Sequence, residues 1–359
     1  MRVAVTGATG NVGTALLRRL LGGAAGTEVA GTEVVGTEVV GICRRLPEPT
    51  GPWAGVRWVQ QDVAGPDAVQ RLTDAFAGVD AVVHTAWLIQ PARDPQEMER
   101  VNLTGSANVV RAALAAGVPH LVHLSSVGAY ATHPADDGRV DESWPADGIT
   151  PSQYSREKAA VESHLDGVER DHPELLVTRV RPALVFQRDA GSEIARYFLG
   201  PFVPTRLLRR VRLPVLPLPE GLRFQVVHAD DLADALARIL ERTPGGAFNV
   251  ADEPVLRARD LALSLNAPRF VPVSRRLVRA SADVTYRARV HPVQPGWLDL
   301  GFGVPVMDTT RARRELGWRP AHAARDVLVE LLDGVRDHAG APSGALRRRT
   351  GLVTSRTGT

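Results

Sequence analysis

The sequence predicts an α/β fold, a doubly wound parallel sheet with a smaller C-terminal substrate-binding lobe. The chain opens on a short apolar run, Val3 to Val5, followed by a glycine-rich turn and an amphipathic helix pattern. Apolar strand runs and helix patterns then alternate to about residue 189, which is typical of a Rossmann-like sheet with crossover helices. From 190 to 222 the alternation gives way to a stretch rich in Pro, Arg and large apolar residues, which predicts a separate lobe.

The opening strand, turn and helix match the dinucleotide-binding fingerprint. Gly7 permits the tight turn, Gly10 lets the backbone approach a pyrophosphate, and Gly13 allows the helix to pack closely on the strand. The first N–H groups of the helix have no partner within the helix and favour a bound anion. We therefore expect a cofactor site formed by Gly7, Thr9, Gly10, Asn11, Val12 and Gly13.

The second strand is expected at residues 38–43, after an unusual repeat. A five-residue unit that begins Gly-Thr-Glu-Val occurs three times between residues 26 and 40. One copy is enough for the strand, and the other two lengthen the preceding loop. We assign the repeat no function.

The end of this second strand bears on the choice of cofactor. NAD-binding folds place an acidic residue there, which accepts hydrogen bonds from the adenosine ribose. Here the strand ends at Cys43, and Arg44 and Arg45 follow. Either arginine could pair with a 2′-phosphate, so the sequence favours NADP, with NAD as the alternative. The simpler interpretation is two solvated arginines.

The remaining elements follow the same alternation. We expect strands over 56–60, 80–86, 121–125, 175–181 and 224–228, and helices over 68–76, 94–116, from a capping box at 150–153, and 230–240 with Asp230 as its cap. Thr85 and Ala86 end one strand beside the expected cofactor. Residues 1–189 with 223–252 would form the dinucleotide-binding domain, 190–222 and 253–337 the lobe, and 338–359 a disordered tail.

Composition excludes several classes of function. The 359 residues carry a net charge of +3 with the two signs interspersed, so we expect no nucleic-acid partner. No apolar stretch is long enough to cross a membrane, the single cysteine allows no internal disulfide, and no signal peptide precedes the first strand. We expect a cytoplasmic protein that acts on a small molecule. The histidines show no metal-binding spacing, and the scattered tryptophans are expected in the core or at its rim.

The candidate catalytic residues are Tyr154, Lys158 and Ser126. Tyr154 and Lys158 stand at i and i+4 of a predicted helix and so share a face. Lys158 is the only lysine of the chain, and a fixed ammonium would lower the pKa of the phenol for proton transfer. Ser126 ends the preceding strand and could hydrogen-bond the same substrate oxygen. The alternative is an ordinary amphipathic helix with a packed Tyr154 and a solvated Lys158.

With these residues the chain resembles the extended short-chain dehydrogenases/reductases, the NAD-dependent epimerase/dehydratase family. The resemblance covers about residues 1–335 and rests on the fingerprint, on Ser125–Tyr130, on Tyr154 with Lys158, and on 101–108, 181–182, 228–231 and 315–320. It implies that Tyr154 is the general acid/base, that Lys158 also binds the nicotinamide ribose and that Ser126 orients the substrate. It further implies that Asp62 and Val63 contact adenine, that Val185 contacts the cofactor, that Asn102 has a structural or proton-relay part, and that a homodimer is possible.

Departures from the family pattern narrow the reaction. The family's sugar-nucleotide dehydratases carry an Asp-Glu pair after the catalytic hydroxyl residue, whereas Val127 and Gly128 follow Ser126 here. The asparagine that epimerases often carry after the strand ending at Arg181 is also missing. We expect an NAD(P)-dependent oxidoreductase that interconverts a carbonyl and an alcohol on a small, moderately apolar substrate. The alternatives are a nucleotide-sugar epimerase and a non-catalytic NADP-binding sensor.

Overall fold

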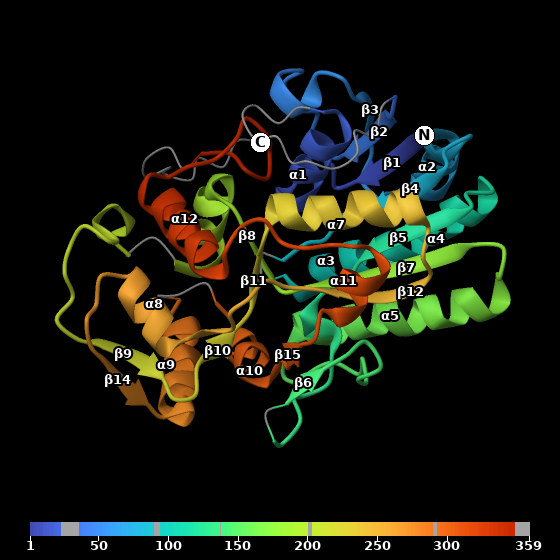
Figure 1. The fold of residues 1–359 in the computed structure, drawn as a ribbon. Coiled ribbons are helices and arrows are strands. Elements are labelled where there is room, and N and C mark those ends of the chain that lie inside the picture. Colours follow the sequence, from blue (N-terminus) through green and yellow to red (C-terminus); the bar gives the residue numbers. More distant parts are fainter. Residues whose placement is uncertain (23–35, 90–93, 137, 200–202, 290–292, 349–359) are drawn as a thin grey trace.

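A computed structural model of the chain describes residues 1–22, 36–89, 94–136, 138–199, 203–289 and 293–348 (Figure 1). At the centre of these residues lies a parallel sheet in the order β12-β7-β5-β4-β1-β2-β3. This confirms the predicted doubly wound Rossmann-like fold. The strands of the sheet are β1 (Arg2–Thr6), β2 (Glu38–Cys43), β3 (Arg57–Gln60), β4 (Ala81–His84), β5 (His120–Leu124), β7 (Leu176–Pro182) and β12 (Gly246–Val250).

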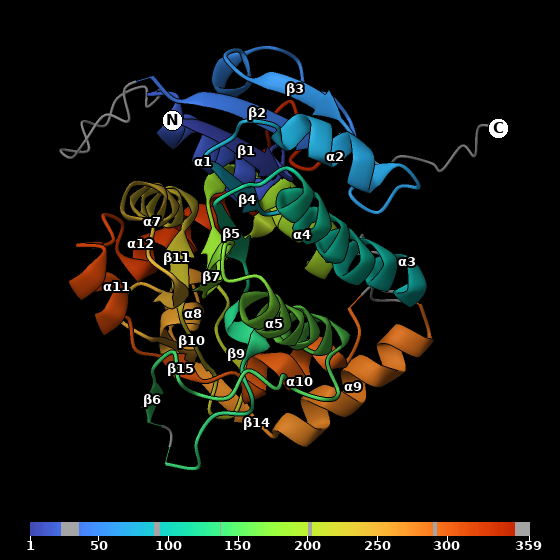
Figure 2. The same cartoon turned by 90° about the vertical axis from the view of Figure 1, so that its right-hand side faces the viewer.

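Helices cover both faces of the sheet (Figure 2). One face carries α1 (Asn11–Leu20) and α7 (Ala229–Arg242), and the other carries α2 (Ala68–Phe76), α4 (Gly105–Ala115) and α5 (Gln153–Asp171). A short α3 (Pro95–Glu99) and a π-helical stretch (Arg100–Thr104) lead into α4. Because both faces are covered, consecutive residues of β1 are all inaccessible: Val3 and Val5 pack toward α1, and Ala4 packs toward α2.

Two helix starts differ from the expectation by one or two residues. The helix expected from a box at 150–153 is capped by Ser152, whose hydroxyl accepts a hydrogen bond from the Ser155 N–H. The helix expected to be capped by Asp230 begins at Ala229 and is capped by the His228 ring. The Asp94 cap is confirmed, since its carboxylate accepts from the Glu97 N–H at 3.0 Å. The first two copies of the repeat lie outside the described residues.

The lobe lies beside the carboxyl ends of the strands, at the lower left of Figure 1. It contains β9 (Leu216–Pro219) paired with β14 (Phe270–Val273), and α8 (Ala258–Ser264), α9 (Arg275–Arg287) and α10 (Gly296–Gly303). Two strand pairs join it to the sheet domain: β6 (Arg139–Val140) with β15 (Val306–Met307), and β10 (Arg223–Phe224) with β13 (Leu256–Arg257). A further pair, β8 (Leu184–Phe186) with β11 (Val226–His228), lies within the sheet domain. The remaining short helical segments are Gly51–Trp53, Val127–Ala129, Arg188–Ala190, α6 (Gly191–Ile194), a π-helical Ala195–Leu199, and Thr205–Leu207.

The end of the chain returns to the sheet domain. After α11 (Thr310–Glu315), the fully buried Trp318 packs in the same core cluster as α1 and α7. After α12 (Ala324–Arg336), residues 337–348 run back across the molecule to α1 (Figure 1). Leu346 there is 0% exposed, and Ser343 donates a hydrogen bond to the Thr9 carbonyl. The expectation of a disordered tail from residue 338 is therefore wrong for residues 338–348.

Candidate active site

One cavity of about 1080 Å³ opens where the strands of the sheet end and the lobe begins. The structure brings all the predicted site residues to its wall: Gly7, Thr9, Gly10, Asn11, Val12, Gly13, Arg44, Arg45, Asp62, Val63, Thr85, Ala86, Ser126, Tyr154, Lys158 and Val185. These residues come from distant segments of the sequence. Their convergence follows from the topology, because parallel strands present their carboxyl ends at one edge of the sheet.

The turn after β1 has no room for side chains. Gly7 has a φ of +70°, and a Cβ atom there would lie 2.7 Å from the backbone of Ala86. A Cβ atom on Gly13 would lie 2.3 Å from the Gly7 carbonyl oxygen. Such distances are shorter than van der Waals contact, so glycine is required at both positions. The turn leaves an open cradle at the start of α1, which fits the phosphates of a dinucleotide.

Side chains beside this cradle are held by hydrogen bonds. Asn11 donates to the Val185 carbonyl at 3.1 Å, which joins the start of α1 to β8. Asp62 accepts from the Ala64 N–H at 3.0 Å and forms an ion pair of 3.2 Å with Arg100. The carboxylate expected near adenine is therefore already fixed by protein groups.

Tyr154 lies in the first turn of α5, against the loop that follows β5. A Cβ atom on Gly128 would lie 2.8 Å from the Tyr154 ring, so the glycine after Ser126-Val127 makes room for the phenol. The Ser126 hydroxyl accepts from the Gly128 N–H at 2.9 Å and also hydrogen-bonds the Tyr154 hydroxyl. The Ser126 hydroxyl and the Tyr154 phenol therefore lie close together, and one substrate oxygen could hydrogen-bond both.

The pKa of the phenol differs from the expectation. Burial raises the pKa of Tyr154 to about 12, and the hydrogen bond with Ser126 offsets only part of this effect. The sequence predicted a pKa lowered by Lys158, which does not hold in this arrangement. The physical reason is that burial disfavours the charged phenolate, while Lys158 makes no resolved contribution to the pKa of Tyr154.

Lys158 is buried, and it lines the same cavity as Tyr154. Its ammonium donates to the Leu124 carbonyl at 2.8 Å and lies 3.4 Å from the centre of the Trp87 ring. Burial lowers the pKa of Lys158 to about 7, against the opposing effect of the Glu162 and Glu157 carboxylates. A neutral amine and an ammonium are therefore both accessible at physiological pH.

Two tryptophans, Trp87 and Trp297, pack against the Tyr154 ring, and Phe198 packs against Trp297; we call these three side chains the aromatic cage. The Tyr154 ring is 6.1 Å from the Trp87 ring and 5.0 Å from the Trp297 ring, and Phe198 is 5.2 Å from Trp297. Trp87 packs at the rim of the core as expected, and both Trp87 and Trp297 also line the cavity. Trp87 directly follows Thr85-Ala86, which was the signal available in the sequence. No local signal marks Trp297, because the lobe brings it to the site.

Two further residues belong to the site: Asn102, for which the resemblance implied a structural or proton-relay part, and Glu193, which was not predicted. Asn102 holds the loop behind Trp87, since its amide accepts from the Leu88 N–H at 2.7 Å and donates to the Leu88 carbonyl at 2.9 Å. Glu193, from α6, lines the cavity, and burial raises the pKa of its carboxyl to about 7. Asn102 thus has a structural part, and Glu193 adds a titratable group.

Comparison with known families agrees with this geometry. A family model described as "NAD dependent epimerase/dehydratase family" matches residues 3–251. The chain belongs to this family. Its members use a nicotinamide cofactor, and the glycine cradle of this chain fits such a dinucleotide. The family membership confirms the resemblance to the extended short-chain dehydrogenases/reductases.

Individual relatives of this family member are distant. An uncharacterized protein of Mycobacterium bovis is 29% identical over 343 residues, which cover 95% of this chain but 31% of that protein. A 4-hydroxy-2-methyl-3-oxo-4-farnesyl-3,4-dihydroquinoline-1-oxide ketoreductase of Stigmatella aurantiaca is 26% identical, over 78% of this chain and 83% of that protein. The crystal structure of a dTDP-glucose 4,6-dehydratase from Streptomyces venezuelae with NAD and TYD bound matches with a TM-score of 0.67 and 23% identity, over 94% and 97% of the two chains. The last likeness concerns the fold.

The described residues contain no helix with the length and apolar character needed to cross a bilayer. Within the same residues, no three His, Cys, Asp or Glu side chains gather as a metal site.

Proposed function

We propose that this chain is an NADP-dependent ketoreductase that reduces the carbonyl of a small, apolar substrate, with Tyr154 as the proton donor. The observation that carries the proposal is the surroundings of the phenol. Tyr154 hydrogen-bonds Ser126 and packs against the two tryptophans of the aromatic cage. This combination offers a proton donor beside apolar aromatic rings.

The dinucleotide would be held by the glycine cradle, with its adenosine toward Arg44 and Arg45. When bound, it supplies the hydride. The guanidinium groups of the two arginines favour a 2′-phosphate over a free ribose hydroxyl, because they form charge-assisted hydrogen bonds with phosphate. This supports NADP over NAD.

Tyr154 performs the proton transfer in this proposal. With a pKa of about 12 the phenol is protonated at physiological pH, which is the form that donates to a carbonyl oxygen. As the carbonyl carbon gains a hydride, its oxygen gains the phenolic proton, and the product is an alcohol. The Ser126 hydroxyl holds the oxygen in place. Lys158, whose ammonium lies 3.4 Å from the centre of the Trp87 ring, can return a proton to the site.

The character of the pocket supports an apolar substrate. The cavity that contains Tyr154 is lined by many apolar side chains, which include Trp87, Leu88, Ile89, Phe198, Trp297, Leu298 and Val304. Val127 and Gly128 place no acid after Ser126 that could protonate a leaving hydroxyl. The Stigmatella relative is named as a ketoreductase of a farnesylated quinoline N-oxide, which is an apolar, aromatic carbonyl compound.

The proposal is tested by following NADPH absorbance with a panel of aromatic and aliphatic ketones. We expect turnover with a subset of apolar ketones and a loss of about 10²- to 10⁴-fold in kcat for Tyr154→Phe, the range typical of a general acid. Cofactor affinity should persist in that variant. Full turnover by Tyr154→Phe on the same ketone would refute the assigned role.

A nucleotide-sugar epimerase is the second candidate. The observation in its favour is Arg223, a buried arginine of β10 that lines the substrate end of the cavity and could pair with a diphosphate. Calorimetric titration with UDP and TDP distinguishes the candidates. Tight binding that is lost in Arg223→Met would support the epimerase, whereas no binding, together with ketone reduction, would support the ketoreductase.

A further inference from the structure

The last described residues of the chain lie directly on the dinucleotide fingerprint; we call Gly340–Arg348 the C-terminal strap. Ser343 is the contact point. Its hydroxyl donates to the Thr9 carbonyl at 2.9 Å and accepts from the Leu346 N–H at 3.1 Å. Both oxygens and the serine side chain are buried, with Ser343 only 4% exposed. The hydroxyl therefore joins the turn of the strap to the turn after β1.

The strap is anchored by packing as well. Leu346 is fully buried in a cluster with Ala195, Leu331 and Val335. The Arg196 guanidinium donates to the Ala345 carbonyl at 2.6 Å and to the Arg347 carbonyl at 2.8 Å. One side chain of the Ala195–Leu199 segment thus holds two backbone groups of the strap in place.

The backbone of the strap also makes a close turn. The Ala341 N–H donates to the Leu346 carbonyl at 2.8 Å. A Cβ atom on Gly340 would lie 2.3 Å from that same carbonyl oxygen, so the turn closes only with glycine at this position. A glycine-rich, polar sequence, which predicts disorder by composition, here forms a compact turn.

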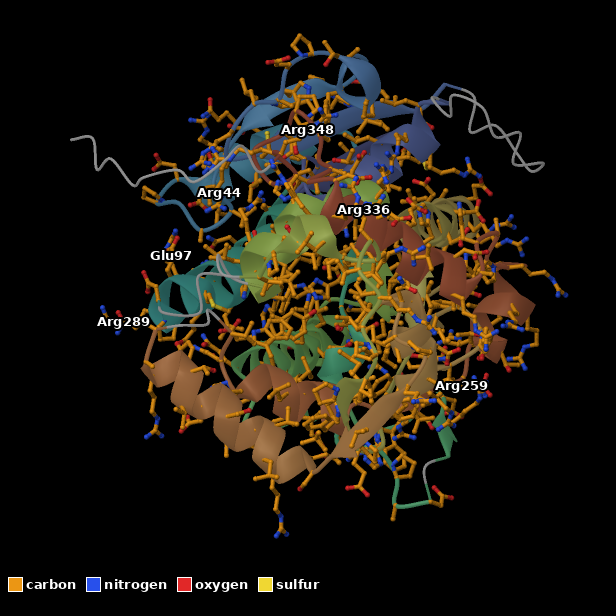
Figure 3. The ribbon with its side chains drawn as sticks, turned by 90° about the vertical axis from the view of Figure 1, so that its left-hand side faces the viewer. Arg44, Glu97, Arg259, Arg289, Arg336 and Arg348 are labelled. Carbon is orange, nitrogen blue, oxygen red and sulfur yellow. The ribbon has the colours of Figure 1, made fainter. Side chains whose placement is uncertain are left out.

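The docked strap forms part of the cofactor cleft. Gly344, Ala345 and Arg347 line the same cavity as the fingerprint residues and Arg44. The Cβ position of Gly344 lies 3.6 Å from Cδ of Arg45. Figure 3 shows Arg44 and the strap residue Arg348 at the same end of the molecule, and Arg259 at the other end.

We propose that the C-terminal strap is a cofactor-binding element, which covers the adenosine half of the dinucleotide and adds the Arg347 guanidinium to those of Arg44 and Arg45. Three arginines around one pocket form a site for a dianionic phosphate on an adenosine ribose. The Ser343–Thr9 hydrogen bond sets the distance between the strap and the cradle. This inference rests on the proposed NADP cofactor and is independent of the substrate and of the reaction direction.

Replacing Arg347 and replacing Ser343 should change dinucleotide affinity in different ways. Arg347→Ala should weaken NADP⁺ binding about three- to fivefold and leave NAD⁺ binding unchanged, because an exposed ion pair with phosphate is lost. Ser343→Ala should weaken both dinucleotides alike, about threefold, because the strap docks less often. Arg259→Ala, an exposed arginine of α8 outside the cavity, serves as the matched control and should bind as the unaltered chain does.

The measurement is isothermal titration calorimetry of the full-length chain, these three variants and Arg44→Ala with NADP⁺ and NAD⁺. Hydrogen–deuterium exchange gives a second readout, since peptides that cover 340–348 should exchange more slowly when NADP⁺ saturates the protein. Unchanged affinity in Arg347→Ala and Ser343→Ala, or tighter binding in either, would overturn the inference. If Arg44→Ala alone weakens NADP⁺ binding, the strap proposal fails and the proposed cofactor stands. If the unaltered chain binds neither dinucleotide, the proposed function fails as well.

Discussion

The ammonium of Lys158 lies 3.4 Å from the centre of the Trp87 ring, while its other contact is the Leu124 carbonyl. A cation over the face of an indole is stabilised by the ring quadrupole. Both side chains line the cavity. Resemblance to the family assigns the same ammonium to the nicotinamide ribose, so the ring and a bound ribose would compete for one cation.

This competition predicts that cofactor binding displaces Trp87. The indole would leave the cation and change its surroundings, which should change its fluorescence. We expect a change in tryptophan emission on titration with NADP⁺ that is reduced in Trp87→Phe. Trp53→Phe, a buried tryptophan outside the cavity lining, is the control and should keep the full change. An identical change in Trp87→Phe and the unaltered chain would show that the indole stays in place.

Lys158 predicts an unusual pH dependence of stability. Its pKa falls from 10.5 to about 7 on folding because of burial. Between these values the unfolded chain binds more protons, so the contribution of Lys158 to the free energy of unfolding rises with pH. Below pH 7 the full cost of burying the ammonium is present, and above 10.5 it is absent.

Replacing this lysine should therefore stabilise the protein while it abolishes function. Lys158→Met keeps the length of the side chain and its packing on Trp87. We expect the variant to be more stable than the unaltered chain near pH 6 and the difference to shrink toward pH 10. Urea unfolding of both proteins across this range measures it. A difference that is constant with pH would mean that Lys158 titrates normally.

Glu193 is expected to change stability with pH in the direction opposite to Lys158. Burial raises the pKa of its carboxyl from 4.5 to about 7, so the unfolded chain loses this proton first as pH rises. Stability should fall between these values, and Glu193→Gln should remove that fall. The variant is expected to match the unaltered chain near pH 4.5 and to exceed its stability at pH 8. Thermal unfolding at both pH values, with the exposed Glu241→Gln of α7 as control, provides the check.

Substitution of Gly128 tests whether the Tyr154 ring packs directly against this residue. A Cβ atom at residue 128 would lie 2.8 Å from the phenol ring, so Gly128→Ala should displace the ring and cost about 1–3 kcal/mol of stability, as overpacking does. Gly167, within α5, has no atom within 4 Å of its Cβ position. Gly167→Ala should stabilise the helix by roughly 0.5–1 kcal/mol. Equal melting temperatures for the two variants would contradict the close contact at Gly128.

Local sequence patterns were enough to predict most of the fold and part of the candidate site. The fingerprint glycines, the Asp94 cap and the Tyr154–Lys158 spacing are each defined by a few neighbouring residues, and the structure places them as expected. Trp297 and the C-terminal strap were missed because only long-range packing brings them to the cavity. The pKa of Tyr154 was expected to fall and instead rises, since the effect depends on burial by residues from the lobe.

Lys158 is the only lysine in the chain, and it lies in the cofactor cleft. Reagents that acylate lysine amines therefore have one target side chain in this sequence. With a pKa of about 7, the amine carries a large neutral share at neutral pH and is nucleophilic there. A protease that cuts after lysine would cleave the unfolded, unmodified chain once, into residues 1–158 and 159–359. Acylation would block that cut, so the fraction left uncut becomes a direct readout of how well a bound molecule shields the cleft.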